Sequence, residues 1–209
     1  MIIRLPVGDA EALARFLQEL VCIPSPSTQE GALAARVAEE MRRVGFADVW
    51  TSRIGSVIGR IGPGHGPNLL FDGHMDTVDV GDPARWSPPP SGGVIEDGVL
   101  YGRGACDMKG GLAAMIYSAK ALLDSGVELG GDLYVAAVVQ EEPCEGLAVR
   151  VLVEEEGLRP DFVLLGEPTN LQISRGQRGR IEIQVDIQGR AAHASSPALG
   201  ENAIHNAAR

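Results

Sequence analysis

A histidine lies between two aspartates in the segment DGHMD, residues 72–76. The apolar run LLF comes directly before it, so the pattern predicts a buried strand that ends in acidic side chains. Along an extended chain Asp76 shares a face with His74, where its carboxylate could orient the imidazole ring. A single histidine at a strand end is more often structural, so a metal site here requires further ligands from elsewhere in the chain.

Acidic residues also follow two other apolar runs. LYVAAVV (133–139) and FVLL (162–165) are predicted to be buried strands, and they lead into Glu141 and Glu142 and into Glu167. The glycine-rich loop GRGACDMKGG (102–111) carries Asp107. In open α/β sheets, ligands bind beyond the carboxyl ends of the strands. We therefore expect these acids to converge on His74 although they are distant in sequence.

One imidazole among several carboxylates is a ligand set that suits a catalytic metal ion. Zn²⁺ fits this set, with Co²⁺ or Mn²⁺ as alternatives, whereas structural zinc sites prefer thiolates. Adjacent residues of an extended segment point to opposite sides, so one of Glu141 and Glu142 can bind metal while the other faces the substrate as a general base. The alternative interpretation of this pair is charged residues where a buried strand meets solvent.

The elements that must position these residues alternate between strands and helices. Apolar periodicity predicts helices over 9–21, 31–44, 110–123 and 147–156, the second of them opened by a capping box at residues 27–30. Strands are also expected near DVWTS and SVIGRI, and VIEDGVLYG is expected to form a hairpin that turns at Asp97 and Gly98. The expected fold class is α/β, with a mixed, largely parallel sheet covered by helices.

The pattern changes near residue 179. In the segment 181–187 four apolar residues alternate with polar ones, which predicts a strand that buries one face. The segment ENAIHNAAR (201–209) is typical of a helix start. We therefore expect a catalytic domain over residues 1–178 and the beginning of a smaller domain over residues 179–209.

Composition narrows the class of protein. The 209 residues are 44% hydrophobic and carry a formal net charge of −10, which argues against a nucleic-acid partner because phosphate binding needs clustered Lys and Arg. The apolar runs are far shorter than a membrane span, so no membrane association is expected. Three cysteines without CxxC spacing favour reduced thiols and a cytoplasmic location.

Four motifs, GHMDTV, GRGACDMKGG, the EE pair and GEPT, resemble those of the co-catalytic zinc amidohydrolase and peptidase family. Its members include acetylornithine deacetylase, succinyl-diaminopimelate desuccinylase, aminoacylase and carboxypeptidase G. The resemblance covers nearly the whole chain, and RGQRGR and AAHASSP are similar to that family's entry into its α+β lid, or dimerisation, domain. It implies a homodimeric hydrolase for the amide bond of N-acyl amino acids or short peptides. A metallo-carboxypeptidase or dipeptidase is the alternative within the enzyme class.

The resemblance also implies a metal-ligand set for two Zn²⁺ ions. His74 and Glu167 would bind the first ion, Glu142 would bind the second, and Asp107 would bridge both. A cis peptide is expected after the bridging Asp107. Two such ions share a bridging water and lower its pKa toward neutrality.

Three further roles follow from the same resemblance. Glu141 would be the general acid/base, taking a proton from the metal-bridged water and delivering it to the leaving amine. Asp76 would hold His74, and His193 would reach the active site of the neighbouring subunit to stabilise the oxyanion.

The chain departs from the family pattern at its C-terminal side. Family members complete the second zinc site with a histidine downstream of the lid, so four of the usual five ligands can be placed here, and the return segment of the catalytic domain is lacking. A fragment or truncated product is therefore expected, weakly active or inactive by itself. The alternative function is a non-catalytic, metal-binding or dimerising remnant. A nucleotide-binding domain is disfavoured because the glycine-rich segment at residues 62–66 precedes a strand instead of a helix.

Overall fold

The computed structural model describes residues 6–176 and 178–208 of the chain. The chain divides into two compact units, Met1–Leu171 and Gln172–Arg209. The predicted residues of the metal site lie in the first unit, and His193 lies in the second. The domain boundary expected near residue 179 stays a prediction.

The first unit is built on a five-stranded sheet with the order β1-β2-β6-β3-β7. The strands are β1 Asp48–Thr51, β2 Val57–Ile61, β3 Asn68–His74, β6 Asp132–Val138 and β7 Phe162–Leu165. β3 pairs in parallel with both β6 and β7, whereas β2 is antiparallel to both of its neighbours. β2 alone therefore runs against the other four strands, which confirms the mixed, largely parallel sheet.

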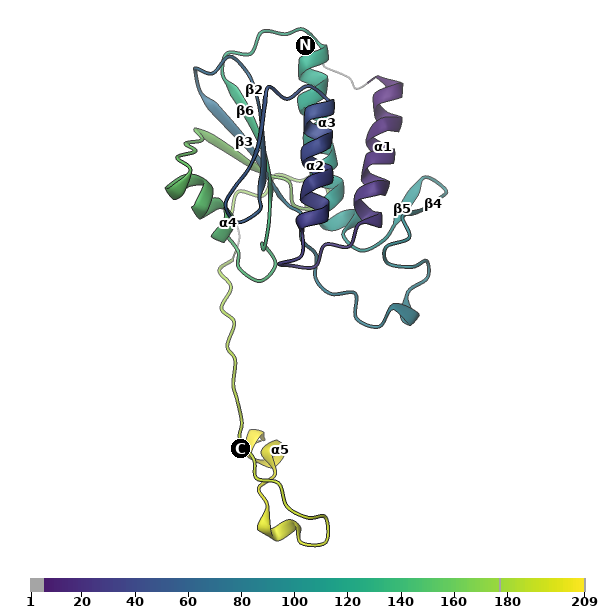
Figure 1. The fold of residues 1–209 in the computed structure, drawn as a ribbon, viewed down its shortest axis with the longest axis vertical. Coiled ribbons are helices and arrows are strands. Elements are labelled where there is room, and N and C mark those ends of the chain that lie inside the picture. The colour runs from purple at the N-terminus through teal and green to yellow at the C-terminus, as the bar shows by residue number, and fades with distance from the viewer. Residues whose placement is uncertain (1–5, 177, 209) are drawn as a thin grey trace. The chain divides into compact units, whose positions relative to one another are not determined.

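Helices cover both faces of this sheet (Figure 1). α1 (Val7–Cys22), α2 (Gly31–Arg43) and α3 (Gly110–Asp124) pack on one face, and α4 (Leu147–Arg150) continues into the turn η3 (Val151–Glu155) on the other. In β6, Val135 and Ala137 belong to the core on the α1–α3 side, while Ala136 and Val138 belong to the core on the α4 side. Because both faces of β6 are buried, its sequence is a continuous apolar run without alternation.

The predicted capping box before α2 is not formed. α2 begins at Gly31, and its N-terminus has no side-chain cap. The Ser27 hydroxyl instead donates to Asp76 Oδ2 at 2.7 Å, and Glu30 Oε1 accepts from the backbone N–H of Gln140 at 3.0 Å. The prediction was wrong because both side chains bind loops that lie far away in sequence, and the apolar stripe of α2 holds the helix without a cap.

A long connection joins β3 to α3. It contains the short turn η1 (Pro83–Arg85), the hairpin β4 (Val94–Glu96) and β5 (Val99–Tyr101), and the irregular turn η2 (Ala105–Lys109). Asp97 and Gly98 have φ angles of 50° and 79°, which are typical of the two-residue hairpin turn predicted at this position. The connection ends by delivering Asp107 to the N-terminal end of α3.

The second unit contains little regular structure in its described residues. It includes the turn η4 (Pro197–Leu199) and the helix α5 (Ala203–Ala207), whose first turn is capped by the Asn202 side chain accepting from the Ile204 N–H at 2.9 Å. The strand predicted over 181–187 is not formed, and its apolar side chains are exposed. The alternation marks a face that could be buried, but a strand also needs a partner for its backbone groups, and no described residue pairs with this segment.

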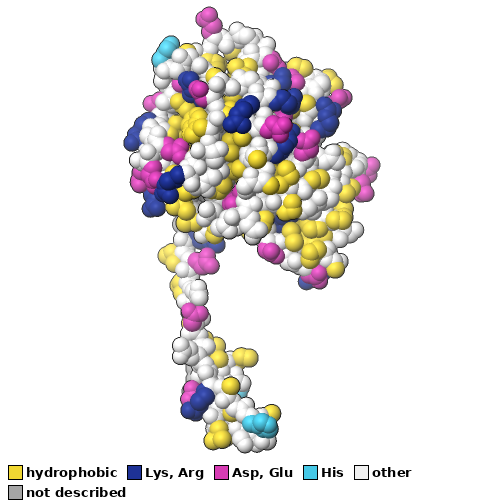
Figure 2. Space-filling model, viewed as in Figure 1, with side chains coloured by type: hydrophobic (Ala, Val, Ile, Leu, Met, Phe, Trp, Pro, Cys, Tyr) yellow, Lys and Arg dark blue, Asp and Glu magenta, His cyan; other side chains and the backbone are white. Residues whose placement is uncertain are grey.

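The surface of the first unit mixes charges of both signs. Acidic and basic side chains are interspersed over the face that Figure 2 shows, and some of them pair, as Arg60 does with Asp48 and Arg53 does with Glu155. Such exposed pairs contribute little to stability. Among the helices of the described residues, none has the length and apolar character needed to cross a membrane.

Candidate metal centre and active site

His74 is the last residue of β3, and its side chain is almost completely buried. Its Nδ1 lies 2.8 Å from the backbone carbonyl oxygen of Asp76, and its Nε2 lies 3.1 Å from Asp107 Oδ1. Since a carbonyl oxygen only accepts hydrogen bonds, Nδ1 carries a proton. Nε2 is therefore the nitrogen that can bind a cation.

The Asp76 carboxylate lies near His74 without a hydrogen bond to its ring, and its predicted role in holding the ring stays a prediction. Its Oδ1 lies 3.7 Å from His74 Nδ1, so the ring is fixed by the Asp76 carbonyl instead. The carboxylate, which is fully buried, accepts the backbone N–H groups of Glu141 at 3.0 Å and Glu142 at 3.2 Å. Asp76 therefore orients the imidazole with its main chain and the turn after β6 with its side chain.

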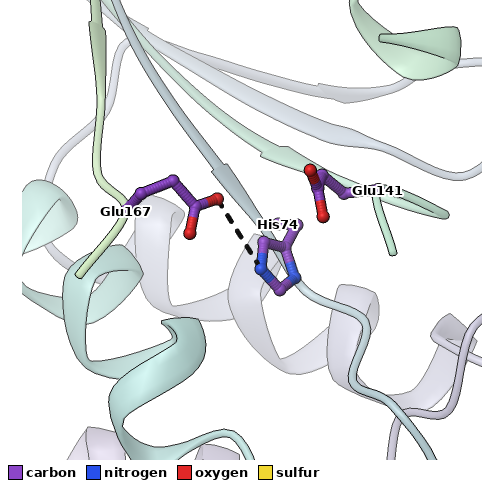
Figure 3. Close-up of side chains that lie close together, drawn as sticks. All are labelled: His74, Glu141 and Glu167. Atoms are coloured by element: carbon purple, nitrogen blue, oxygen red, sulfur yellow. Dashed lines mark ion pairs between the residues drawn. The ribbon is translucent and has the colours of Figure 1, made fainter. Parts of the chain in front are cut away.

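Five predicted site residues come together at the carboxyl ends of three neighbouring parallel strands. Their ligand atoms form two groups within 4.8 Å: His74, Glu141 and Glu167 in one, and His74, Asp107 and Glu142 in the other. Figure 3 shows Glu141 and Glu167 on either side of the His74 ring, and Glu167 Oε1 lies 3.7 Å from Nε2. The convergence expected from the strand ends is thus present, while the assignment of each ligand to a particular ion stays a prediction.

The turn that carries Glu141 and Glu142 is not the extended segment assumed from the sequence. β6 ends at Val138, and Gln140 has a φ of 57°, so the chain bends before the two glutamates. Glu141 nevertheless faces Glu167, and Glu142 falls in the group with Asp107. The two glutamates thus fall in different ligand groups, and their separate roles stay a prediction.

The carboxylates of the site perturb one another. Burial raises the pKa of Glu167 to about 7, against the favourable charge of His74 and with help from nearby Asp107. Burial also raises the pKa of Glu141, and the neighbouring Glu142 adds to this rise. Burial lowers the pKa of His74, but hydrogen bonding to Asp76 and the adjacent acids outweigh it, so the pKa is raised. A divalent cation would relieve this crowding of negative charge, so the donor set fits a metal ion.

The turn that carries Asp107 also contains a buried lysine that the sequence did not predict. Asp107 lies in η2, and the peptide bond between Asp107 and Met108 is cis, as expected. The following Lys109 is buried, and its Nζ donates to the carbonyl oxygens of Leu20 and Ile23, both at 2.9 Å. Burial lowers the pKa of Lys109 to about 8. The sequence does contain a signal for this burial. Lys109 directly precedes the largely apolar helix α3, where a buried position is expected.

His193 lies in the second unit and is exposed. Its Nδ1 is 2.9 Å from Ser195 Oγ. Its predicted reach into the active site of a neighbouring subunit stays a prediction.

Asp72 is a buried acid two residues before His74, and its Oδ1 has no hydrogen-bond partner among the described residues. Burial raises its pKa from 3.8 to about 6. An acid whose pKa is raised on folding destabilises the folded state once the pH exceeds the pKa that the acid has in the unfolded chain. The full penalty, at most about 3 kcal/mol, is present above about pH 6.

We therefore expect Asp72→Asn to raise the free energy of unfolding of the metal-free protein at pH 7.5 by about 1–3 kcal/mol. The gain should shrink as the pH falls from 6 to 4, because the wild-type carboxyl group becomes neutral. Urea denaturation at pH 7.5 and at pH 4 measures the gain in stability. Glu128→Gln, a substitution at an exposed position, is the matched control. A gain of equal size at pH 4 and pH 7.5 would contradict the explanation.

The sequence of residues 70–209 matches the model of peptidase family M20/M25/M40. Protein YgeY of Escherichia coli K12, described as uncharacterised, is 45% identical over 193 residues, which cover 92% of this chain and 47% of that protein. A succinyl-diaminopimelate desuccinylase of Methylorubrum populi is 36% identical over 214 residues, 95% of this chain and 55% of the enzyme. The chain thus spans about half the length of the curated relatives it matches.

A solved structure supports the same relationship. The M20 family metallo-carboxypeptidase Sso-CP2 from Sulfolobus solfataricus superimposes with a TM-score of 0.63 at 25% sequence identity. The superposition covers 77% of this chain and 37% of that enzyme. It agrees with the α/β architecture of the first unit.

Proposed function

The chain belongs to peptidase family M20/M25/M40, and on this premise we propose that it is a metal-dependent hydrolase of the amide bond in N-acyl amino acids or short peptides. The observation that carries the proposal is the buried imidazole of His74 among four carboxylates at the ends of three parallel strands. A purely structural histidine needs no such crowd of acids, because each one adds a desolvation cost.

The proposed cofactor is two Zn²⁺ ions, with Co²⁺ or Mn²⁺ as substitutes. We assign His74 and Glu167 to one ion, Glu142 to the other and Asp107 to both. In support, His74 and Glu167 fall in one ligand group, and Asp107 and Glu142 fall together in the other. Bound divalent ions would supply positive charge for the developing oxyanion and lower the pKa of coordinated water.

Glu141 is the proposed general acid/base. Its carboxylate is half-buried, and its pKa is raised by burial, so it binds a proton more readily at neutral pH than an exposed glutamate does. It would take a proton from water, hold it, and deliver it to the nitrogen of the leaving amine as the amide C–N bond breaks. Asp76 holds the backbone of Glu141 in place for this task.

The substrate is proposed to be an N-acyl amino acid first and a short peptide second. The desuccinylase relative supports the first choice, and the metallo-carboxypeptidase supports the alternative of an exopeptidase or dipeptidase. We further propose a homodimer through the second unit, with His193 contributed across the interface. A cytoplasmic location is proposed from the three free cysteines.

A reconstitution experiment tests the function. The full-length gene product, stripped of metal, is expected to bind two Zn²⁺ ions and to hydrolyse at least one of a panel of N-succinyl, N-acetyl and dipeptide substrates, with activity lost on chelation and restored by Zn²⁺ or Co²⁺. Metal content is measured by mass spectrometry and turnover by amine release. Metal binding without turnover would favour the non-catalytic remnant, and the absence of both would reject the proposal.

A further inference from the structure

We propose that Glu30, at the start of α2, is a positioning residue that fixes the turn bearing Glu141 and Glu142. The inference rests on the proposed function, because it assigns a role to Glu30 through those two site residues. Glu30 is separated from this turn by about 110 positions in sequence, and it belongs to neither ligand group.

Two buried carboxylates bind three successive backbone N–H groups of the turn. Glu30 Oε1 accepts from Gln140 at 3.0 Å, and the two oxygens of Asp76 accept from Glu141 at 3.0 Å and Glu142 at 3.2 Å. Hydrogen bonds from N–H groups to a carboxylate are charge-assisted and stronger than neutral ones. Together they fix the path of the backbone from the end of β6 through both glutamates.

The residue that Glu30 holds is the one whose conformation is unfavourable. Gln140 has a φ of 57°, in the left-handed region that non-glycine residues enter only at a cost. β6 ends at Val138, so this left-handed residue bends the chain directly before Glu141 and Glu142. The hydrogen bond that Glu30 accepts from Gln140 therefore acts on the backbone position that orients Glu141 and Glu142.

The burial of Glu30 supports a specific task. Its side chain is buried, and a buried carboxylate is costly unless it is hydrogen-bonded. It does not cap α2, which begins without a side-chain cap. Ser27, from the same segment, donates to Asp76 Oδ2 at 2.7 Å, so this segment also contacts the carboxylate that binds Glu141 and Glu142.

Three variants of Glu30 test the role. Glu30→Ala removes the acceptor, Glu30→Asp withdraws it by one methylene while keeping the charge, and Glu30→Gln keeps an oxygen of the same reach. We expect the Ala and Asp variants to bind Zn²⁺ about 10–100-fold more weakly in calorimetric titrations of the folded, metal-free protein, as is usual when a group that orients ligands is lost. Glu30→Gln should keep most of the wild-type Zn²⁺ affinity. In the Ala and Asp variants, kcat should fall by a larger factor than KM rises.

Glu40→Gln is the matched control for a purely structural effect. Glu40 is also a buried glutamate of α2, but it accepts from Arg36, Arg43 and Tyr117, away from the site. This variant should lower the thermal midpoint without changing the Zn²⁺ affinity of the folded protein. If the Ala and Asp variants of Glu30 behave in the same way, the positioning role is wrong.

Hydrogen exchange separates this inference from the proposed function. In the metal-free protein, Glu30→Ala or Glu30→Asp should speed exchange of the amides of residues 140–142 at least tenfold, while the amides of β3 stay protected. If the wild-type protein binds no metal, the proposed function fails, and this measurement still decides the inference. Unchanged exchange at residues 140–142 would overturn it.

Discussion

Replacement of Glu141 by glutamine is expected to lower kcat by about 10²–10⁴-fold, because a positioned general base contributes that much and an amide cannot accept the proton. The metal content should stay close to that of the wild type. The substitution conserves shape, so the backbone bond from Glu141 to Asp76 can persist. Steady-state kinetics and metal analysis of the same preparation measure both quantities.

The metal content also decides between two roles for Glu141. Its carboxylate lies within 4.8 Å of the ligand atoms of His74 and Glu167, close enough to share an ion with them. A Gln variant that loses one ion together with its activity would make Glu141 a ligand, and one with near-normal rates would exclude both roles. Glu154→Gln, at an exposed position on η3, is the control and should retain both activity and metal.

The sequence allowed the convergence of the strand ends to be predicted, for a physical reason. Burial on both faces makes β6 a continuous apolar run, and the polar residues that follow it stand out. In β3 the same contrast marks His74. Parallel pairing of β3 with β6 and β7 then brings their carboxyl ends to one edge. The apolar runs followed by polar residues could therefore be recognised in the sequence, although the contacts that they form join residues far apart in the chain.

The supporting hydrogen bonds could not be predicted in this way. Ser27 and Glu30 have the residue types and spacing of a helix cap, and nothing in the local sequence shows that their partners are Asp76 and Gln140. Cap residues and residues that bind loop backbones are the same polar types. Only the fold decides between the two roles.

Lys109 and the 181–187 segment show that the polarity of a side chain does not by itself decide whether it is buried. Lys109 is charged but buried, because two carbonyl oxygens at the end of α1 accept its hydrogen bonds. In 181–187 the apolar residues alternate but remain exposed, because no described residue offers a strand to pair with. Hydrophobic patterns report the preference of a side chain, and they do not report whether the partner is present.

Replacement of His74 by glutamine is expected to lower Zn²⁺ affinity by more than about 100-fold, which exceeds the usual effect of residues that only orient ligands. His74 is the one residue shared by both ligand groups, and it supplies the only nitrogen in either. His65 is exposed outside the site, so His65→Ala should bind Zn²⁺ like the wild type. Calorimetric titration of the metal-free proteins compares the three.

The metal preference of the His74→Gln variant tests the ligand role of His74 more directly than the loss of Zn²⁺ affinity does. Without the imidazole, the remaining proposed ligands, Asp107, Glu142 and Glu167, offer only carboxylate oxygens. Mn²⁺ and Mg²⁺ are well suited to oxygen ligands, whereas Zn²⁺ gains more from nitrogen or sulfur, so the loss of a nitrogen ligand weakens Zn²⁺ binding more than Mn²⁺ binding. The ratio of Mn²⁺ to Zn²⁺ affinity should therefore rise in the variant. If the affinities for Mn²⁺ and Zn²⁺ fall by the same factor, His74 acts by shaping the pocket and is not a ligand. Loss of a nitrogen ligand should weaken Zn²⁺ binding more, because Zn²⁺ prefers nitrogen more strongly.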